Sequence, residues 1–264
     1  MSETDPSSLP ASSMLAEWLS DLTGAARFLT RLPLKREDTA AGEELARTTR
    51  AFPLVGAGIG LAGGVVYGAA DWLGLPSVIA AFLALGAMIL LTGGLHEDGL
   101  ADVADGFGSG ADAQEKLDIM RDSRIGAFGV IALILSLAIR AGALAALAAP
   151  GAVLAALVVA GAGSRAATAA VMAWLEPARS DGLAATAGQP SSDRVWTAVA
   201  LGTAAAVLIF GPGAGVLAAL IGGAAAAGVG HLARRQIGGS TGDVLGAVQQ
   251  VSEGAILLVA VAAY

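Results

Sequence analysis

The chain has 264 residues, of which 55% are hydrophobic and only 14% are charged, and its mean hydropathy is +0.71. Because a soluble domain carries about a quarter charged residues, this composition predicts a membrane-embedded protein. The net charge of −7 excludes a protein that sequesters nucleic acid, and the absence of Cys excludes disulfides and thiolate metal sites. The 37 glycines, with abundant Ala, are typical of closely packed transmembrane helices.

The N-terminal region divides into a polar extension and a predicted interfacial helix. Residues Met1–Ser13 are rich in Ser and Pro, which predicts disorder. No Lys or Arg precedes Arg27, so this region does not resemble a cleaved signal peptide. The apolar residues of Met14–Leu34 recur at helical spacing, which predicts an amphipathic helix that lies at the membrane interface and ends at Pro33. Residues 14–264 show no internal repeat, and we expect a single membrane-embedded domain.

Seven apolar stretches follow, and several approach the ~20 residues that span a bilayer. They are Ala51–Ala70, Ser77–Leu95, Gly126–Ala148, Ala152–Ala173, Val195–Phe210, Gly213–Gly230 and Val251–Tyr264. The fifth and the last are short. The pattern predicts an all-α fold: a polytopic integral membrane helix bundle with about six to seven transmembrane helices, plus the N-terminal amphipathic interfacial helix.

The connections between these stretches alternate between short and long. The short ones are Asp71–Pro76, Ala149–Gly151 and Gly211–Pro212, whereas the long polar ones are His96–Ile125, Trp174–Arg194 and His231–Gln250. Of the fifteen Lys and Arg residues, only Arg140 and Arg165 lie outside the N-terminal segment and the long connections. The positive-inside rule then places the N-terminus and every long connection in the cytoplasm. A site assembled from these connections would face the cytoplasm.

The first long connection opens with an acidic stretch, Leu95–Gly106, directly after an apolar run. Asp98, Asp102 and Asp105 stand at i, i+4 and i+7, so a helix would present all three carboxylates on one face. Like charges this close repel one another unless a cation lies among them, and Mg²⁺ prefers oxygen ligands. A solvated acidic helix face is the alternative, but the adjoining apolar run and the interleaved glycines favour a site. His96 is either a general base or an anchor of the helix end.

The same connection continues with a second charged block, Glu115–Gly126. Asp118 and Asp122 are again four residues apart and can share a helix face. Arg121 and Arg124 offer fork-shaped donors that suit a diphosphate. Salt bridges within one surface helix are the alternative interpretation, but they explain less well why the block directly precedes a glycine-containing turn into the next apolar stretch.

The last long connection carries a glycine-rich segment, Gly238–Ala247. Its backbone N–H groups around Thr241 and Gly242 could bind phosphate, and Asp243 could join a metal. Glycine alone is a weak signal, because close helix packing also selects it. The functional interpretation is strengthened because this is the third acid-bearing connection on the same predicted side of the membrane.

Two arginines, Arg140 and Arg165, fall inside apolar stretches. A charge at membrane depth is costly and normally faces a partner or a water-filled cavity. Arg140 could instead extend its side chain to the interface. Arg165 follows Ser164 well inside its stretch, and we expect it to line a polar cavity and to bind an anion such as phosphate.

Taken together, these blocks resemble the adenosylcobinamide-GDP ribazoletransferases, also called cobalamin synthases. The resemblance runs in order from about Phe28 to the C-terminus and rests on His96–Gly106, Ile119–Gly126, Gly239–Ala247, Phe28–Pro33 and Ser164–Arg165. The first two blocks together are highly specific. Asp118 departs from the pattern, since Glu is expected there, which shortens the reach of the carboxylate and puts its role in doubt. The extension Met1–Ser13 lies outside the resemblance.

The resemblance implies a Mg²⁺-dependent, multi-pass enzyme of the cell inner membrane, with residues 14–264 as its catalytic domain. Such an enzyme joins adenosylcobinamide-GDP to α-ribazole, or to α-ribazole 5′-phosphate, and releases GMP. A second copy of the chain, in a homo-oligomer, is a further candidate partner. We assign the metal to Asp98, Asp102, Asp105, Asp122 and Asp243. The catalytic candidates are Asp98, Asp102, Asp105, Asp122 and His96. The substrate-binding candidates are Arg121, Ser123, Arg124, Arg165, Thr241 and Gly242.

Two other functions fit parts of the sequence. A CDP-alcohol phosphotransferase also uses spaced acids on membrane helices with Mg²⁺, but its DGxxAR element is absent, because Leu100-Ala101-Asp102 follows Asp98-Gly99. A transporter would place acids deep within apolar segments to form an ion path. We expect no acid in the core of any of the seven stretches, which argues against a transporter.

Overall fold

The computed structural model describes residues 11–34 and 41–263, and within them the elements are helical. The helices are α1 (Ala11–Leu29), α2 (Ala41–Thr48), η2 (Thr49–Ala51), α3 (Phe52–Trp72), α4 (Ser77–Thr92), α5 (Leu95–Ser109), α6 (Ala113–Ile119), α7 (Ala127–Leu147), α8 (Pro150–Trp174), α9 (Leu183–Ala187), α10 (Ser192–Ile237) and α11 (Gly242–Ala263). Extended backbone pairs only at an isolated bridge between Pro177 and Ser240 in this part of the chain. The predicted all-α membrane bundle is confirmed.

The centre of the bundle is α8, which packs against α3, α10 and α11. Glycines allow α3 and α8 to approach backbone to backbone. A Cβ on Gly56 or Gly161 would collide with the carbonyl of the other, and a Cβ on Gly60 would collide with the carbonyl of Leu157. Small residues at a helix interface gain van der Waals contact where lipid offers no hydrophobic driving force. The glycine-rich composition therefore serves packing in this interface.

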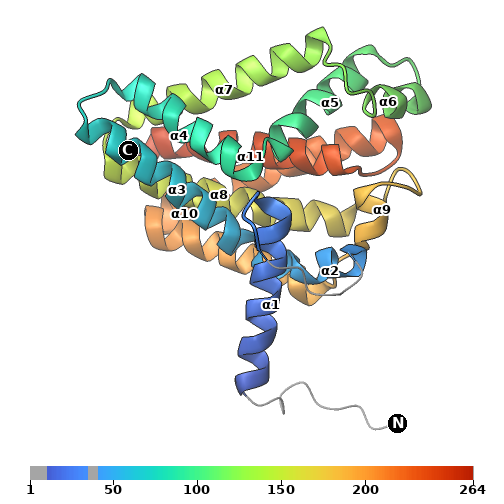
Figure 1. The fold of residues 1–264 in the computed structure, drawn as a ribbon, viewed down its shortest axis with the longest axis horizontal. Helices are drawn as coiled ribbons and strands as arrows, with labels where there is room; N and C mark the ends of the chain where they lie inside the picture. The colour runs from blue at the N-terminus through green and yellow to red at the C-terminus, as the bar shows by residue number, and fades with distance from the viewer. Residues whose placement is uncertain (1–10, 35–40, 264) are drawn as a thin grey trace.

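The long connections gather at one end of the bundle. Figure 1 shows α6, α9 and the α10–α11 joint at one end, with the α3–α4 and α7–α8 turns at the other. Within the described residues, five helices are long and apolar enough to cross a membrane, or six if the bent pair α4 and α5 is one span. The alternation read from the sequence is thus reproduced in space, and it separates a polar end from an apolar one.

Helix α10 contains two of the predicted stretches, Val195–Phe210 and Gly213–Gly230. Its helical backbone breaks at Gly211, whose φ of 81° is left-handed, and Pro212 follows. A Cβ on Gly215 would lie 2.5 Å from the Cα of Val207. Residues eight apart in a straight helix lie about 12 Å apart along its axis, so the chain folds back on itself here. The α10 helix therefore forms two adjacent legs.

The predicted stretch Ser77–Leu95 is broken near its end. Gly93 and Gly94 both adopt left-handed backbone conformations, with φ of 69° and 72°. Glycine takes this conformation without a Cβ penalty. The axes of α4 and α5 consequently differ by 92°, and the acidic stretch continues as a helix of its own, so its expected helical conformation is confirmed.

Helix α1 ends at Leu29, four residues before the predicted end at Pro33. The chain leaves the helix because the N–H of Arg31 donates to the carbonyl of Leu91, at 2.7 Å, at the end of α4. Figure 1 shows α1 projecting from the bundle, and it exposes apolar side chains such as Met14 and Leu15. Of the extension predicted to be disordered, Ala11–Ser13 belongs to α1 and residues 1–10 lie outside the described residues.

Candidate functional site

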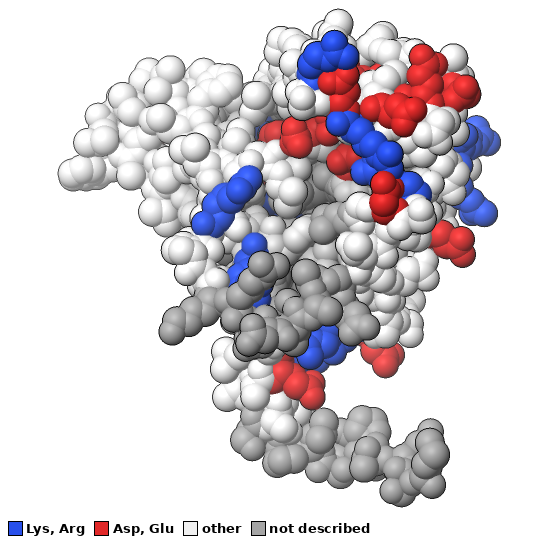
Figure 2. All heavy atoms as spheres, turned by 45° about the vertical axis from the view of Figure 1, so that its right-hand side comes forward, with Lys and Arg blue, Asp and Glu red and all other residues white. Residues whose placement is uncertain are grey.

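Two adjacent cavities open at the polar end, where Figure 2 shows charged side chains gathered. The larger cavity, of about 610 Å³, is lined on its polar side by Arg31, Glu97, Asp98, Asp102, Arg121, Asp122 and Ser123. The smaller cavity, of about 140 Å³, is lined by His96, Asp98, Arg165, Thr168, Arg179, Gly242 and Asp243 together with apolar side chains. Asp98 borders both cavities, so the first acid of the predicted cluster stands where they meet.

The three predicted acids of α5 lie at increasing depth. Asp98 is exposed, Asp102 is half-buried and Asp105 is only 6% exposed. The carboxylate of Asp105 accepts the N–H of Gly126 at 2.7 Å and that of Gly129 at 2.8 Å. These donors belong to the first turn of α7, which favours a carboxylate electrostatically. A Cβ on Gly126 would lie 2.5 Å from Asp105 Oδ1, so both glycines leave room for this acid. Asp105 therefore joins α5 to α7.

Asp98 and Asp102 differ from Asp105 in having no partner. Within the described part of the chain, no hydrogen bond or ion pair engages either carboxylate. Asp102 also lies within the electrostatic reach of Asp98, Asp243 and Asp105. Carboxylates that repel one another and lack a cationic partner are the arrangement in which a bound cation is stabilising.

Asp243 reaches this group from the opposite end of the sequence. Helix α11 packs on α5 so closely that a Cβ on Gly99 would lie 2.7 Å from the carbonyl oxygen of Asp243. The hydroxyl of Thr241 donates to Asp243 Oδ2 at 3.2 Å, and a nitrogen of Arg179 lies 3.8 Å from the same oxygen. Thr241 also accepts the N–H of Val244 and so caps α11. The structure thus brings Asp243 to the α5 acids.

The donor set suits an open Mg²⁺ site better than a closed one. Among the described residues, no three His, Asp or Glu side chains are arranged so that they alone could hold a metal ion. Mg²⁺ is usually held by one or two carboxylates, with waters and substrate phosphates as its other ligands. The unpaired Asp98 and Asp102, with Asp243 nearby, fit that arrangement. Of the five assigned ligands, Asp105 instead contacts α7.

The second charged block lines the larger cavity through Arg121, Asp122 and Ser123. A single nitrogen of Arg121, Nη2, donates to both carboxylate oxygens of Asp181, at 2.5 and 2.7 Å. Arg124, with 87% of its side chain exposed, lies 2.5 Å from Asp122. Hydrogen bonds from the Arg124 side chain and backbone hold the pKa of Asp122 at about 2.

Asp122 and Arg124 therefore neutralise one another, but they lie beyond the end of α6 at Ile119, so this pair is not the salt bridge within one helix that the alternative interpretation described. Asp118, the position that departs from the family pattern, is exposed and accepts a hydrogen bond from Gln114 at 3.0 Å. It lines neither cavity. The second carboxylate pair, Asp118 and Asp122, is thus not directed at one common point.

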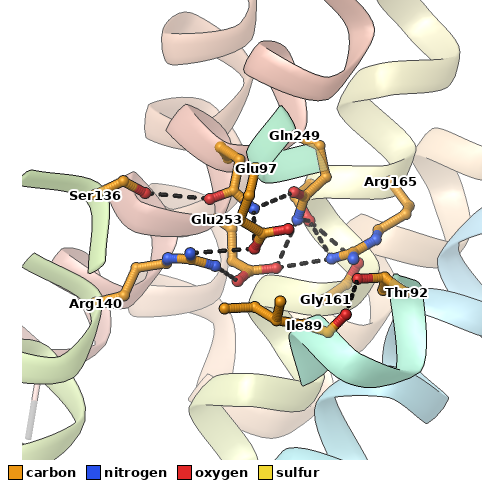
Figure 3. A network of polar contacts seen from close by, with 11 residues as sticks. Ile89, Thr92, Glu97, Ser136, Arg140, Gly161, Arg165, Gln249 and Glu253 are labelled. Atoms are coloured by element: carbon orange, nitrogen blue, oxygen red, sulfur yellow. Dashed lines mark hydrogen bonds and ion pairs between the residues drawn. The ribbon is translucent and has the colours of Figure 1, made fainter. Parts of the chain in front are cut away.

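The intramembrane arginines belong to a buried charge network, defined here as Glu97, Arg140, Arg165, Gln249, Gln250 and Glu253. Figure 3 shows Glu253 between the two arginines. Its carboxylate accepts from Arg165 at 2.7 Å and from Arg140 at 3.1 Å, and Arg140 also contacts Glu97 at 3.2 Å. Two arginines face two glutamates, so the network is neutral.

The buried charge network contradicts one prediction from the sequence, about acids in the apolar stretches, and decides between the two alternatives for Arg140. Glu253 is 1% exposed inside the last apolar stretch, so the expectation of no acid in the core of any stretch was wrong. Arg140 is 2% exposed and does not extend to the interface, so the partnered alternative holds for it. The sequence did contain a signal for Glu253, because two arginines at membrane depth require counter-charges.

Comparison with known proteins gives a consistent result. The family model described as cobalamin-5-phosphate synthase matches residues 21–261. A protein of Bradyrhizobium diazoefficiens is 47% identical over 96% of this chain and 98% of its own length. One of Mesorhizobium japonicum is 49% identical over 92% of this chain and 93% of its own. Both are named adenosylcobinamide-GDP ribazoletransferase.

No solved structure matches the chain. The family match nevertheless runs from within α1 to within α11 and includes every residue of the two cavities. The chain therefore belongs to the cobalamin-5-phosphate synthase family.

Proposed function

We propose that this protein is an adenosylcobinamide-GDP ribazoletransferase that joins adenosylcobinamide-GDP to α-ribazole, or to its 5′-phosphate, and releases GMP. The names of its relatives support this proposal. The observation that carries it is the pair of unpartnered carboxylates, Asp98 and Asp102, on one helix face where two cavities meet. The comparisons do not favour the CDP-alcohol phosphotransferase alternative.

The reaction is a phosphoryl transfer. A ribose hydroxyl of the acceptor attacks the phosphorus that carries cobinamide; a new O–P bond forms, the bond to the GMP oxygen breaks, and the hydroxyl loses its proton. Such transfers depend mainly on positioning and on neutralising the phosphate charge. Mg²⁺ bound to Asp98 and Asp102, with Asp243 nearby, would neutralise and orient the diphosphate.

The protein side chains around the cavities fit separate roles. Arg31 and Arg121 line the larger cavity and would bind the diphosphate oxygens. His96 is 5% exposed and lines the smaller cavity, where it would accept the proton of the attacking hydroxyl. Asp105 would act indirectly, because it fixes α5 against the start of α7.

We further propose that the site faces the cytoplasm from the inner membrane. The described arginines and lysine outside the buried charge network all lie in the N-terminal region that ends with η2 or in the long connections, as the positive-inside rule requires for the cytoplasmic side. Cysteine labelling from outside the cell at an engineered Ser123→Cys and at Ala149→Cys, in the α7–α8 turn, tests this orientation. Labelling of the Ser123→Cys variant without labelling of the Ala149→Cys variant would contradict the proposed orientation.

The activity is tested with purified protein in detergent, Mg²⁺, adenosylcobinamide-GDP and α-ribazole. We expect GMP to form in proportion to the cobalamin product, and EDTA to stop the reaction until Mg²⁺ is restored. Asp71→Asn, in the last turn of α3 at the opposite end, is the matched control for carboxylate changes and should retain full activity. Absence of GMP with both α-ribazole and its 5′-phosphate would refute the proposed function.

A further inference from the structure

The smaller cavity has apolar walls and an edge of charged and polar side chains. The walls are Phe28, Leu29, Leu45, Phe52 and Met172, contributed by α1, α2, α3 and α8. The rings of Phe28 and Phe52 stack with their centroids 6.0 Å apart and an interplanar angle of 16°. Stacked aromatic walls favour a flat apolar ring system as the occupant.

The edge of this cavity carries hydrogen-bond donors without partners. Arg165, although only 2% exposed, uses Nη1 for Glu253 and leaves its buried Nε without a hydrogen bond. Buried Nη1 of Arg179 is also without one. Both arginines line the cavity, so the guanidinium groups set a positive charge beside any occupant and favour one whose heteroatoms accept hydrogen bonds.

The volume limits what can enter. At about 140 Å³ the cavity is smaller than the roughly 300 Å³ at which sites for whole small molecules begin. It therefore holds one portion of a substrate, of the size of a bicyclic heterocycle. Since Asp98 borders both cavities, the remainder of that substrate would extend past Asp98 toward the larger cavity.

We propose that the smaller cavity is the subsite for the heterocyclic base of the acceptor nucleoside, with Phe28 and Phe52 as its walls. This inference rests on the proposed function and adds the placement of the two substrates: the acceptor base in the smaller cavity and the donor diphosphate in the larger one. A benzimidazole has a hydrocarbon edge that matches the walls. Guanine, the other heterocycle of the reaction, has N–H groups that require acceptors; the five wall side chains offer none, and the acceptors of this cavity are confined to its polar lining, which includes Asp98 and Asp243.

The test compares Phe28→Ala with Phe82→Ala, a variant of an exposed ring on α4 that lines neither cavity. We expect Phe28→Ala to raise the KM for α-ribazole roughly tenfold through lost stacking and contact area. Its KM for adenosylcobinamide-GDP, and its kcat at saturating α-ribazole, should remain those of the unmodified protein. Phe82→Ala should leave all three constants unchanged.

A second variant and a binding measurement keep the test independent of turnover. Leu45→Trp adds a ring to the cavity wall and should weaken α-ribazole binding, measured by equilibrium dialysis without donor, at least tenfold. Unchanged dialysis with both Phe28→Ala and Leu45→Trp, or a rise confined to the KM of the donor, would overturn the subsite assignment. Failure of the proposed function is distinguishable, because the unmodified protein would then form no GMP, whatever the two variants bind.

Discussion

Helix α5 carries acidic residues of two kinds. The charge of one is paired within the bundle, and the charges of two others have no partner in the part of the chain that the structure describes. Glu97 belongs to the buried charge network, where it and Glu253 balance Arg140 and Arg165. The next residue, Asp98, faces the cavities, and neither it nor Asp102 has a partner among the described residues. One helix thus carries neutralised charges on one face and uncompensated charges on another.

The difference distinguishes charges that stabilise the fold from charges that bind a ligand. A buried ion pair repays its desolvation only when both members are present, so the network holds α5, α7, α8 and α11 in fixed positions. Repelling carboxylates cost folding energy, and a bound cation would recover that cost. Removing a charge should therefore affect stability in the buried charge network and activity at the cavities.

The largest expected effect on activity comes from Asp102→Asn. We expect GMP formation to fall by at least about a hundredfold, because one of the two charges proposed to hold Mg²⁺ is lost. The melting temperature in detergent should stay constant or rise, since repulsion with Asp98 is relieved. A loss of activity accompanied by an equal loss of folded protein would place Asp102 with the structural charges instead.

Glu253→Gln should have the converse effect. It leaves Arg140 and Arg165 with one counter-charge instead of two, and breaking a buried pair typically costs about 3–5 kcal/mol. The free energy of unfolding in detergent measures this loss. Glu17→Gln, which changes an exposed carboxylate 3.6 Å from Arg50, is the control and should cost less than about 1 kcal/mol. Equal stability of the two variants would show that the network is not structural.

Asp105→Asn should lower both activity and stability, but activity less than Asp102→Asn does and stability less than Glu253→Gln does. The amide has one oxygen where two backbone N–H groups require acceptors, so one of them loses its partner at a cost of about 1–3 kcal/mol. We expect kcat to fall about tenfold to a hundredfold, as for other groups that orient metal ligands, with Mg²⁺ still required. A loss as large as that of Asp102→Asn at unchanged stability would make Asp105 a direct ligand, as the sequence spacing suggested.

Asp181→Asn should have the smallest effect and tests the larger cavity. The pair of Asp181 with Arg121 is largely exposed, so its loss should change stability by less than about 1 kcal/mol. If Arg121 binds the donor diphosphate, Asp181→Asn should leave the donor KM equal or lower, whereas Arg121→Gln should raise it. Equal donor KM values for all three proteins would remove Arg121 from the substrate-binding residues.

The sequence predicted local features well. Apolar stretches and their alternating connections predicted the membrane bundle, the glycine–proline break predicted the fold-back in α10, and the spacing of Asp98 and Asp102 predicted a shared helix face. The two-glycine break before α5 was missed because the apolar run continues through it to Leu95. A hydropathy pattern does not report the left-handed conformations that bend the chain there.

Partnerships between distant segments were harder to predict. Asp105 follows the same spacing as Asp98 and Asp102, yet its partners are backbone N–H groups of α7, which no side-chain pattern indicates. Glu253 balances Arg140 and Arg165 from a helix more than eighty residues away. Which charge finds a partner depends on tertiary packing, and that decides which acids remain free to bind a ligand.

The central claim is that unpartnered carboxylates on α5 bind a divalent cation while the neighbouring network does not. The most direct measurement is Mn²⁺ binding by electron paramagnetic resonance, in the presence of adenosylcobinamide-GDP, to the unmodified protein and to Asp98→Asn, Asp102→Asn and Glu253→Gln. We predict at least tenfold weaker binding in the two α5 variants and nearly unchanged binding in folded Glu253→Gln. Unchanged binding in Asp102→Asn would contradict the claim.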